Sequence, residues 1–106
     1  MPTVWVTQET SHDFSPAEQY GEVRFLTKDD FNNTRNSIAN AALWSELKFI
    51  LKRYDPNEDW IVIAGSPYVA AAVFLLLGLS HHKQIKVLRW DNRDFMYRPM
   101  YMEIPA

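Results

Sequence analysis

The segment Trp60–Leu79, WIVIAGSPYVAAAVFLLLGL, restricts the fold of this chain more than any other stretch. Its first five residues are apolar, which is typical of a central strand covered on both faces. Gly65, Ser66 and Pro67 then mark a turn, because serine favours the helix N-cap and proline the first helical position. An apolar helix follows, and we expect Gly78 to end it. A buried strand that leads directly into a helix predicts an α/β fold.

Further strands and helices are predicted on both sides of this segment. Apolar residues between Ile38 and Tyr54 recur every three or four positions, which predicts an amphipathic helix of about four turns. A shorter helix is expected at Ser15, with Glu18 completing a capping box. Residues with high strand propensity or alternating polarity predict strands at Thr3–Thr7, Glu22–Leu26, Ile85–Trp90 and Phe95–Ile104.

The order of these elements predicts the topology of the sheet. Parallel neighbours need a crossover connection, and crossovers are nearly always right-handed. We therefore expect a three-layer α/β fold with an open, mostly parallel sheet and strand order 2-1-3-4. The C-terminal strand should lie antiparallel at the edge beside strand 4, since Pro99 confines it to an edge or a bulge. The short first helix should cover its face of the sheet only thinly.

Size and composition set the broad class of the protein. A chain of 106 residues is long enough for one domain, residues 1–106, and too short for two ordinary ones. It has no cysteine, which fits a reducing compartment such as the cytoplasm. The N-terminus does not resemble a signal peptide. The longest apolar run, Val69–Leu77, is far shorter than the about 20 residues of a bilayer span, so we expect a soluble protein without a membrane partner.

Two loops should meet at the carboxyl edge of this sheet. The order of strands reverses between strands 1 and 3, and open α/β sheets bind ligands at such a point. The loop after strand 1 is rich in polar side chains, and the amides of the turn after strand 3 lie at a helix N-terminus, where small anionic ligands bind. Two further polar residues end strand 4 at the same edge. The candidate ligand-binding residues are Thr7, Gln8, His12, Gly65, Ser66, Asp91 and Asn92.

Each feature of this site also has a structural interpretation. Ser66 and Pro67 occur at many helix starts that bind nothing, and no glycine-rich phosphate motif is present. His12 beside Asp13 suggests a proton-transfer pair, although adjacent residues in an extended loop tend to point apart. The pair His81-His82 offers too few ligands for zinc. We therefore expect no metal and no cofactor, and we assign no catalytic residue.

The helix Val69–Leu77 suggests a second kind of function. It has no polar face, and a helix that is apolar all round must be covered all round. The sheet can cover one side only, so another element or a second subunit should cover the rest, and a homodimer is the commonest arrangement. The first hypothesis is a small-molecule or anion-binding domain. The alternative is a homo-oligomeric protein-interaction module without catalytic activity.

Nucleic acid is the third class of partner to consider. The stretch Arg89–Met102 interleaves three arginines with aromatic residues, a combination that can bind phosphates and stack bases. However, Asp91 and Asp94 offset two of these charges, and the chain carries 11 basic against 13 acidic residues. We therefore expect no nucleic-acid partner.

Three stretches resemble small proteins of tailed phages. They are TQE (Thr7–Glu9), IAGSP (Ile63–Pro67) and VLRWDNRDFMYRP (Val87–Pro99), and the resemblance covers most of the chain. Such proteins have no established activity that could be carried over. The resemblance implies a location in the cytoplasm of an infected host cell, and it implies no particular function.

Overall fold

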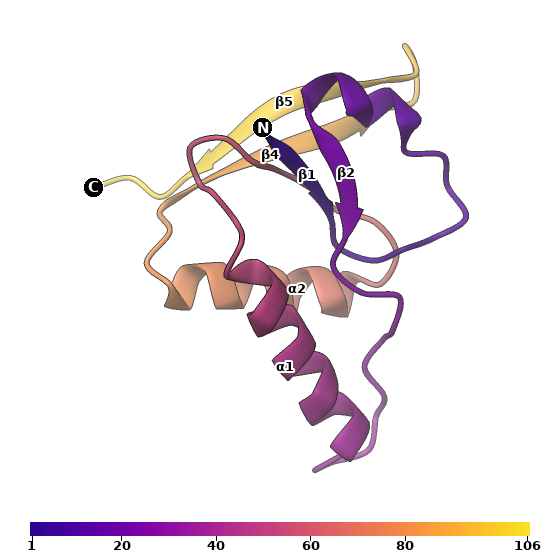
Figure 1. Cartoon of the computed structure of the whole chain (residues 1–106), viewed down its shortest axis with the longest axis vertical. Coiled ribbons are helices and arrows are strands. Elements are labelled where there is room, and N and C mark those ends of the chain that lie inside the picture. Colours follow the sequence, from indigo (N-terminus) through magenta and orange to yellow (C-terminus); the bar gives the residue numbers. More distant parts are fainter.

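The computed structural model describes residues 1–106 and has one mixed sheet of five strands in the order β2-β1-β3-β4-β5. Strands β1 to β4 run parallel, and β5 lies antiparallel to β4 at the edge (Figure 1). The predicted α/β fold, its strand order and its antiparallel edge strand are thus confirmed. The strands are β1 (Thr3–Val6), β2 (Glu22–Phe25), β3 (Trp60–Val62), β4 (Gln84–Asp91) and β5 (Met96–Glu103).

The two faces of the sheet are covered unequally. The helices α1 (Ile38–Leu51) and α2 (Pro67–Leu79) pack on one face, over a core that includes Trp5, Ile61 and Val87. Figure 1 shows α1 slanting away from the sheet, and only two of its residues are buried. The other face carries a smaller core and a single 3-10 helix, η1 (Ser15–Tyr20). None of these helices has the length and apolar composition needed to cross a membrane.

The start of η1 differs from the prediction. Ser15 is not an N-cap, and no side chain of a capping box bonds this helix. Instead, the Ser15 amide donates to the carboxylate of Asp13 at 2.9 Å. That hydrogen bond is the main reason why the pKa of Asp13 lies below its usual range. Asp13 therefore fixes the end of the loop that joins β1 to η1.

The end of α2 also differs from the prediction. Gly78 lies inside the helix, and the left-handed residue after the helix is His81, with φ of 66°. The His82 amide donates to the Leu77 carbonyl at 3.1 Å, and the His81 amide donates to the Gly78 carbonyl at 3.0 Å. These two bonds form a Schellman motif. The histidine pair thus terminates a helix.

A buried carboxylate connects β1 to the turn before β3. Asp59 accepts hydrogen bonds from the Thr3 amide, the Trp5 indole and the Asp55 amide, each at 2.9 Å. These bonds satisfy both oxygens of a side chain that would otherwise be costly to bury. They hold the amino end of β1 beside the start of β3.

Candidate functional site

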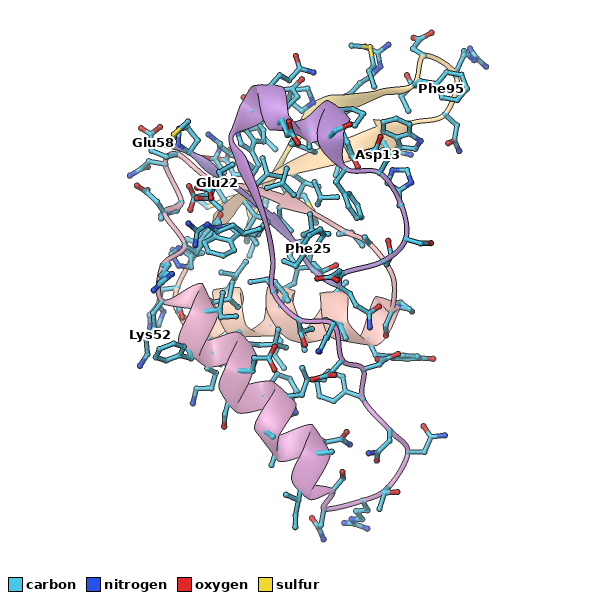
Figure 2. The ribbon with its side chains drawn as sticks, turned by 45° about the vertical axis from the view of Figure 1, so that its right-hand side comes forward. Asp13, Glu22, Phe25, Lys52, Glu58 and Phe95 are labelled. Carbon is cyan, nitrogen blue, oxygen red and sulfur yellow. The ribbon has the colours of Figure 1, made fainter.

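A cavity of about 480 Å³ opens at the carboxyl edge of the sheet, where the loop after β1 passes the ends of β3 and β4. Figure 2 shows this loop, with Asp13 labelled, running beside the β4–β5 hairpin, whose tip carries Phe95. Most of the lining is apolar. It consists of Thr10, His12, Phe14, Val62, Ile63, Ala64, Gly65, Val87, Leu88, Arg89, Trp90, Tyr97 and Met100.

The cavity exists because β3 and β4 separate early. The two strands are in register only at Ile61 and Val87. The hydroxyl of Thr7 accepts from the Ala64 amide and donates to the Ala64 carbonyl, each at 3.0 Å. The chain beyond Val62 therefore stays attached to β1 while β4 continues to Asp91. The gap between the diverging strands opens into the cavity, and the backbone that borders this gap forms the cavity floor.

Aromatic rings form one wall of this cavity. The His12 imidazole lies edge-on between two of them, with its centroid 4.9 Å from that of Phe14 and 5.4 Å from that of Trp90. The rings of Trp90 and Tyr97 are also in edge contact at 4.9 Å. The Trp90 indole N–H donates to Asn92 at 2.7 Å, which fixes the orientation of this ring. The wall therefore contains several rings whose positions are set by their neighbours.

The arginines near the cavity differ in their pairing. Arg98 donates to Asp91 at 2.7 Å and to Asp94 at 2.6 Å. Its hydrogen bond to Asp91 raises the pKa of Arg98 and lowers the pKa of Asp91. Arg89 lines the cavity and is exposed, yet it forms no ion pair. Arg89 is therefore the cation available to a bound anion.

The predicted site residues fall into three groups. His12 and Gly65 line the cavity. Asp91 and Asn92 lie beside it, in a polar depression of about 620 Å³ at the turn of the β4–β5 hairpin. The structure does not place Thr7, Gln8 or Ser66 on either surface, because these side chains bond the backbone.

The turn after β3 is occupied by a side chain of the protein. Gln8 accepts from the Ser66 amide at 2.7 Å and donates to the Asp29 carbonyl at 2.9 Å. A Cβ atom at Gly65 would collide with the Gln8 side-chain oxygen, and Gly65 has φ of 72°. The Ser66 hydroxyl accepts from the Tyr68 and Val69 amides. The amide that an anion would use thus already has a partner, and serine acts as the cap.

The structure also shows how the side chains considered for proton transfer and for metal binding are arranged. The Asp13 carboxylate bonds the Ser15 amide, and it shares no hydrogen bond with the ring of His12. No three His, Asp or Glu side chains are grouped closely enough to hold a metal ion. His12 can still present a ring nitrogen to a ligand, because imidazole both donates and accepts hydrogen bonds.

Sequence reasoning missed much of the cavity. Trp90, Tyr97 and Arg89 lie in the stretch Arg89–Met102, whose composition suggests only a nucleic-acid motif, and no pattern in the sequence indicates Phe14. The alternation of side chains along β4 could have identified Trp90, since Leu88 and Trp90 lie on the same face of the sheet, which η1 covers. The separation of β3 from β4 left no such signal, because the apolar run Trp60–Ala64 is that of an uninterrupted strand.

Comparison with known proteins identifies the family of this chain. Neither the curated proteins nor the solved structures contain a match. A family model described as "Phage Pam3 gp32-like protein" matches residues 2–104, which is nearly the whole chain and confirms the resemblance to phage proteins. The chain therefore belongs to the phage Pam3 gp32-like protein family.

Proposed function

We propose that this protein binds a small molecule in the cavity between β3, β4 and the loop after β1. The observation that carries the proposal is the aromatic wall of a largely apolar cavity at the carboxyl edge of the sheet. Ligand sites are commonly clefts of about 300–1,000 Å³ with apolar walls and a few polar groups, and they favour this edge of α/β sheets.

The charge beside the cavity favours an anionic ligand. Arg89 lines the cavity without a carboxylate partner, whereas the nearby Arg98 is neutralised by two aspartates. A ligand with an apolar or aromatic body and a negatively charged group would use both the ring wall and this guanidinium. Such a charge-assisted hydrogen bond is stronger than a neutral one.

A cavity-filling substitution tests this proposal. Thr10→Trp places a large ring in the cavity, and Ser11→Trp adds the same ring to the next, exposed residue, which does not line it. Compounds from a library of small aromatic acids are screened by thermal shift. A ligand at about 100 times its Kd stabilises the native state by about 2.7 kcal/mol. We expect hits on the native protein that persist in Ser11→Trp and disappear in Thr10→Trp. Hits that survive in Thr10→Trp would contradict the cavity as their site.

Self-association through α2 is a second candidate function, which one observation favours. The side chains of Tyr68, Leu75 and Leu79 are 71%, 56% and 69% exposed, in a helix without any charged residue. Small residues, Ala71 and Gly78, alternate with them along the exposed side. Isolated exposed apolar residues are common, but a contiguous row of them marks an interaction surface.

The spacing of this row suits a second copy of the same helix. In an antiparallel pair related by a two-fold axis near residue 73, Tyr68 would face Gly78 of the second copy. Ala71 would likewise face Leu75, so Tyr68 and Leu75 each meet a small residue. A Cβ atom at Gly78 would contact nothing within the chain, so packing inside the chain does not require glycine there.

Light scattering over a dilution series tests this dimer. Leu75→Glu should give a folded monomer, because the interface would bury an unpaired charge. Ser45→Glu places the same charge on an exposed position of α1 and should leave the dimer intact. A mass near 12.4 kDa for the native chain at high concentration would exclude the dimer.

A further inference from the structure

The backbone at the floor of the cavity carries hydrogen-bonding groups without partners. Ile63 follows the last residue of β3, and neither its N–H nor its C=O takes part in any hydrogen bond. The Thr7 amide donates to the Val62 carbonyl, and Thr7 also bonds both backbone groups of Ala64. The backbone groups of the even-numbered residues Val62 and Ala64 thus point toward β1. Because backbone groups alternate in direction along a strand, those of Ile63 face β4.

The pairing of β4 with β5 determines which backbone groups of β4 point toward Ile63. The Ile104 amide donates to the Lys83 carbonyl, which continues the β4–β5 register. The backbone groups of odd-numbered residues in β4 therefore bond β5, and those of even-numbered residues point toward β3. In an unbroken parallel ladder, Ile63 would bond the Leu88 carbonyl and the Trp90 amide. Since Ile63 forms no hydrogen bond, these two groups lack that partner as well.

These groups form an edge with alternating polarity inside the cavity. Ile63, Leu88 and Trp90 all line it. Along the gap stand the Leu88 carbonyl, the Ile63 amide, the Ile63 carbonyl and the Trp90 amide, which alternate between acceptor and donor. Backbone groups of this kind nearly always find a partner when they are shielded from water. A ligand that displaces water from this edge must therefore present donors and acceptors in a matching order.

A planar heterocycle fits both the edge and the wall. Its ring N–H and carbonyl or ring nitrogen atoms can pair with the backbone edge, while its faces lie against aromatic side chains such as Trp90 and Phe14. Arg89, which lines the same cavity, would bind a phosphate attached to that heterocycle. Simple aromatic acids offer the ring and the charge but not the alternating edge.

We infer that the ligand of this cavity is a nucleobase-type heterocycle, free or as a mononucleotide, held by the unpaired backbone edge of Ile63, Leu88 and Trp90. The inference rests on the proposed function, because it names the ligand class of the same cavity. The inferred ligand is a free small molecule and not part of a nucleic-acid chain.

Calorimetric titration with matched probes tests this inference. The probes are uracil and adenine, their 5′-monophosphates, 1,3-dimethyluracil, which has the ring of uracil but no N–H donor, and naphthalene carboxylate. We expect one of the two bases to bind. If uracil binds, dimethylation should weaken binding at least tenfold, since sites built around hydrogen bonds reject analogues that lack them. If adenine binds, 6-dimethyladenine should show the same loss.

Variants separate the contributions of the ring wall and the charge. Trp90→Ala should weaken binding of the base at least tenfold, whereas Trp90→Phe should retain most of it. Arg89→Gln should weaken binding of the monophosphate several-fold more than binding of the free base. Thr10→Trp should abolish binding of every probe that binds the native protein, and Ser11→Trp should abolish none of it.

Each other outcome overturns a defined part of the account. If naphthalene carboxylate or dimethyluracil binds as tightly as the base, the heterocycle inference fails and the small-molecule cavity stands. If affinity rises with the length of a single-stranded oligonucleotide, a free mononucleotide is not the ligand. If neither these probes nor the aromatic-acid library binds in a manner sensitive to Thr10→Trp, both the inference and the proposed function fail.

Discussion

At the scale of single residues, one carboxylate secures the junction between β1 and the turn before β3. Asp59 is buried and accepts three hydrogen bonds, two of them at Oδ2. Asp59→Asn replaces one carboxylate oxygen by an NH₂ group, which would face at least one of these N–H donors in either orientation of the amide. We expect a loss of about 2 kcal/mol in the free energy of unfolding, since hydrogen bonds to a charged group contribute about 1.5–3 kcal/mol. Urea denaturation measures it.

The neighbouring residue provides the control for this prediction. Glu58 is exposed and forms no side-chain hydrogen bond, so Glu58→Gln removes the same charge without breaking a contact. Its effect should stay within about 0.5 kcal/mol, as for most surface substitutions. Equal losses in Asp59→Asn and Glu58→Gln would mean that charge, and not the three bonds, explains the effect.

Tyr54 gives the protein a dependence on alkaline pH. Its hydroxyl is buried without a hydrogen-bond partner, and burial, with smaller contributions from Asp59 and Asp55, raises the pKa of Tyr54 to about 12. The unfolded chain releases this proton near pH 10, whereas the folded chain retains it to about pH 12. The folded state binds more protons between these values, so stability falls as the pH rises from about 10 to 12.

Substitution of this hydroxyl isolates its contribution. Tyr54→Phe should be neutral or slightly stabilising at pH 8, because it removes a buried group without a partner. Between about pH 9 and 11.5 it should lose less stability than the native chain, with a difference of about 1–2 kcal/mol at the upper end. Urea denaturation of both chains across this range provides the comparison. Parallel curves would show that Tyr54 does not titrate as described.

At the scale of the elements, the end of α2 contains strain that one substitution can relieve. His81 holds a left-handed conformation in a Schellman motif where glycine is the usual residue. The left-handed region costs an L-residue roughly 1–2 kcal/mol. We expect His81→Gly to raise the Tm, by about 4–8 °C for each kcal/mol gained in a domain of about this size.

A glycine at the preceding residue serves as the control. Ser80 has φ of −88°, which any residue adopts without strain. Ser80→Gly should therefore give no gain and should lower the Tm slightly, through the greater freedom of the unfolded chain. Differential scanning calorimetry distinguishes the two variants. A Tm of His81→Gly at or below that of the native chain would refute the strain at this cap.

The elements also show which parts of the site could be predicted. Strand order placed the loop after β1 and the turn after β3 at one edge, and His12 and Gly65 do line one cavity there. The roles of Gln8 and Thr7 were not predictable, because each depends on a hydrogen bond across more than 50 positions of sequence. Periodicity identifies faces and ends of elements, whereas these bonds depend on tertiary geometry.

At the scale of the whole molecule, the order of strands and helices could be predicted because each crossover leaves few alternatives. The separation of β3 from β4 could not be predicted. Trp60–Ala64 is uniformly apolar, yet β3 ends at Val62, and beyond it the Thr7 hydroxyl bonds the backbone of Ala64. The cavity results from that departure, so the sequence indicated the edge of the sheet without indicating the cavity.

The central claim is that the gap between β3 and β4 is a binding site. Titration of ¹⁵N-labelled protein with the monophosphate or base that binds most tightly tests it directly, because each backbone amide reports separately. We expect the largest changes in chemical shift at the amides of Ile63 and Trp90, with smaller changes at Gly65 and His12. Changes confined to α2, or to the hairpin turn at residues 92–95, or spread evenly over the sheet, would contradict it.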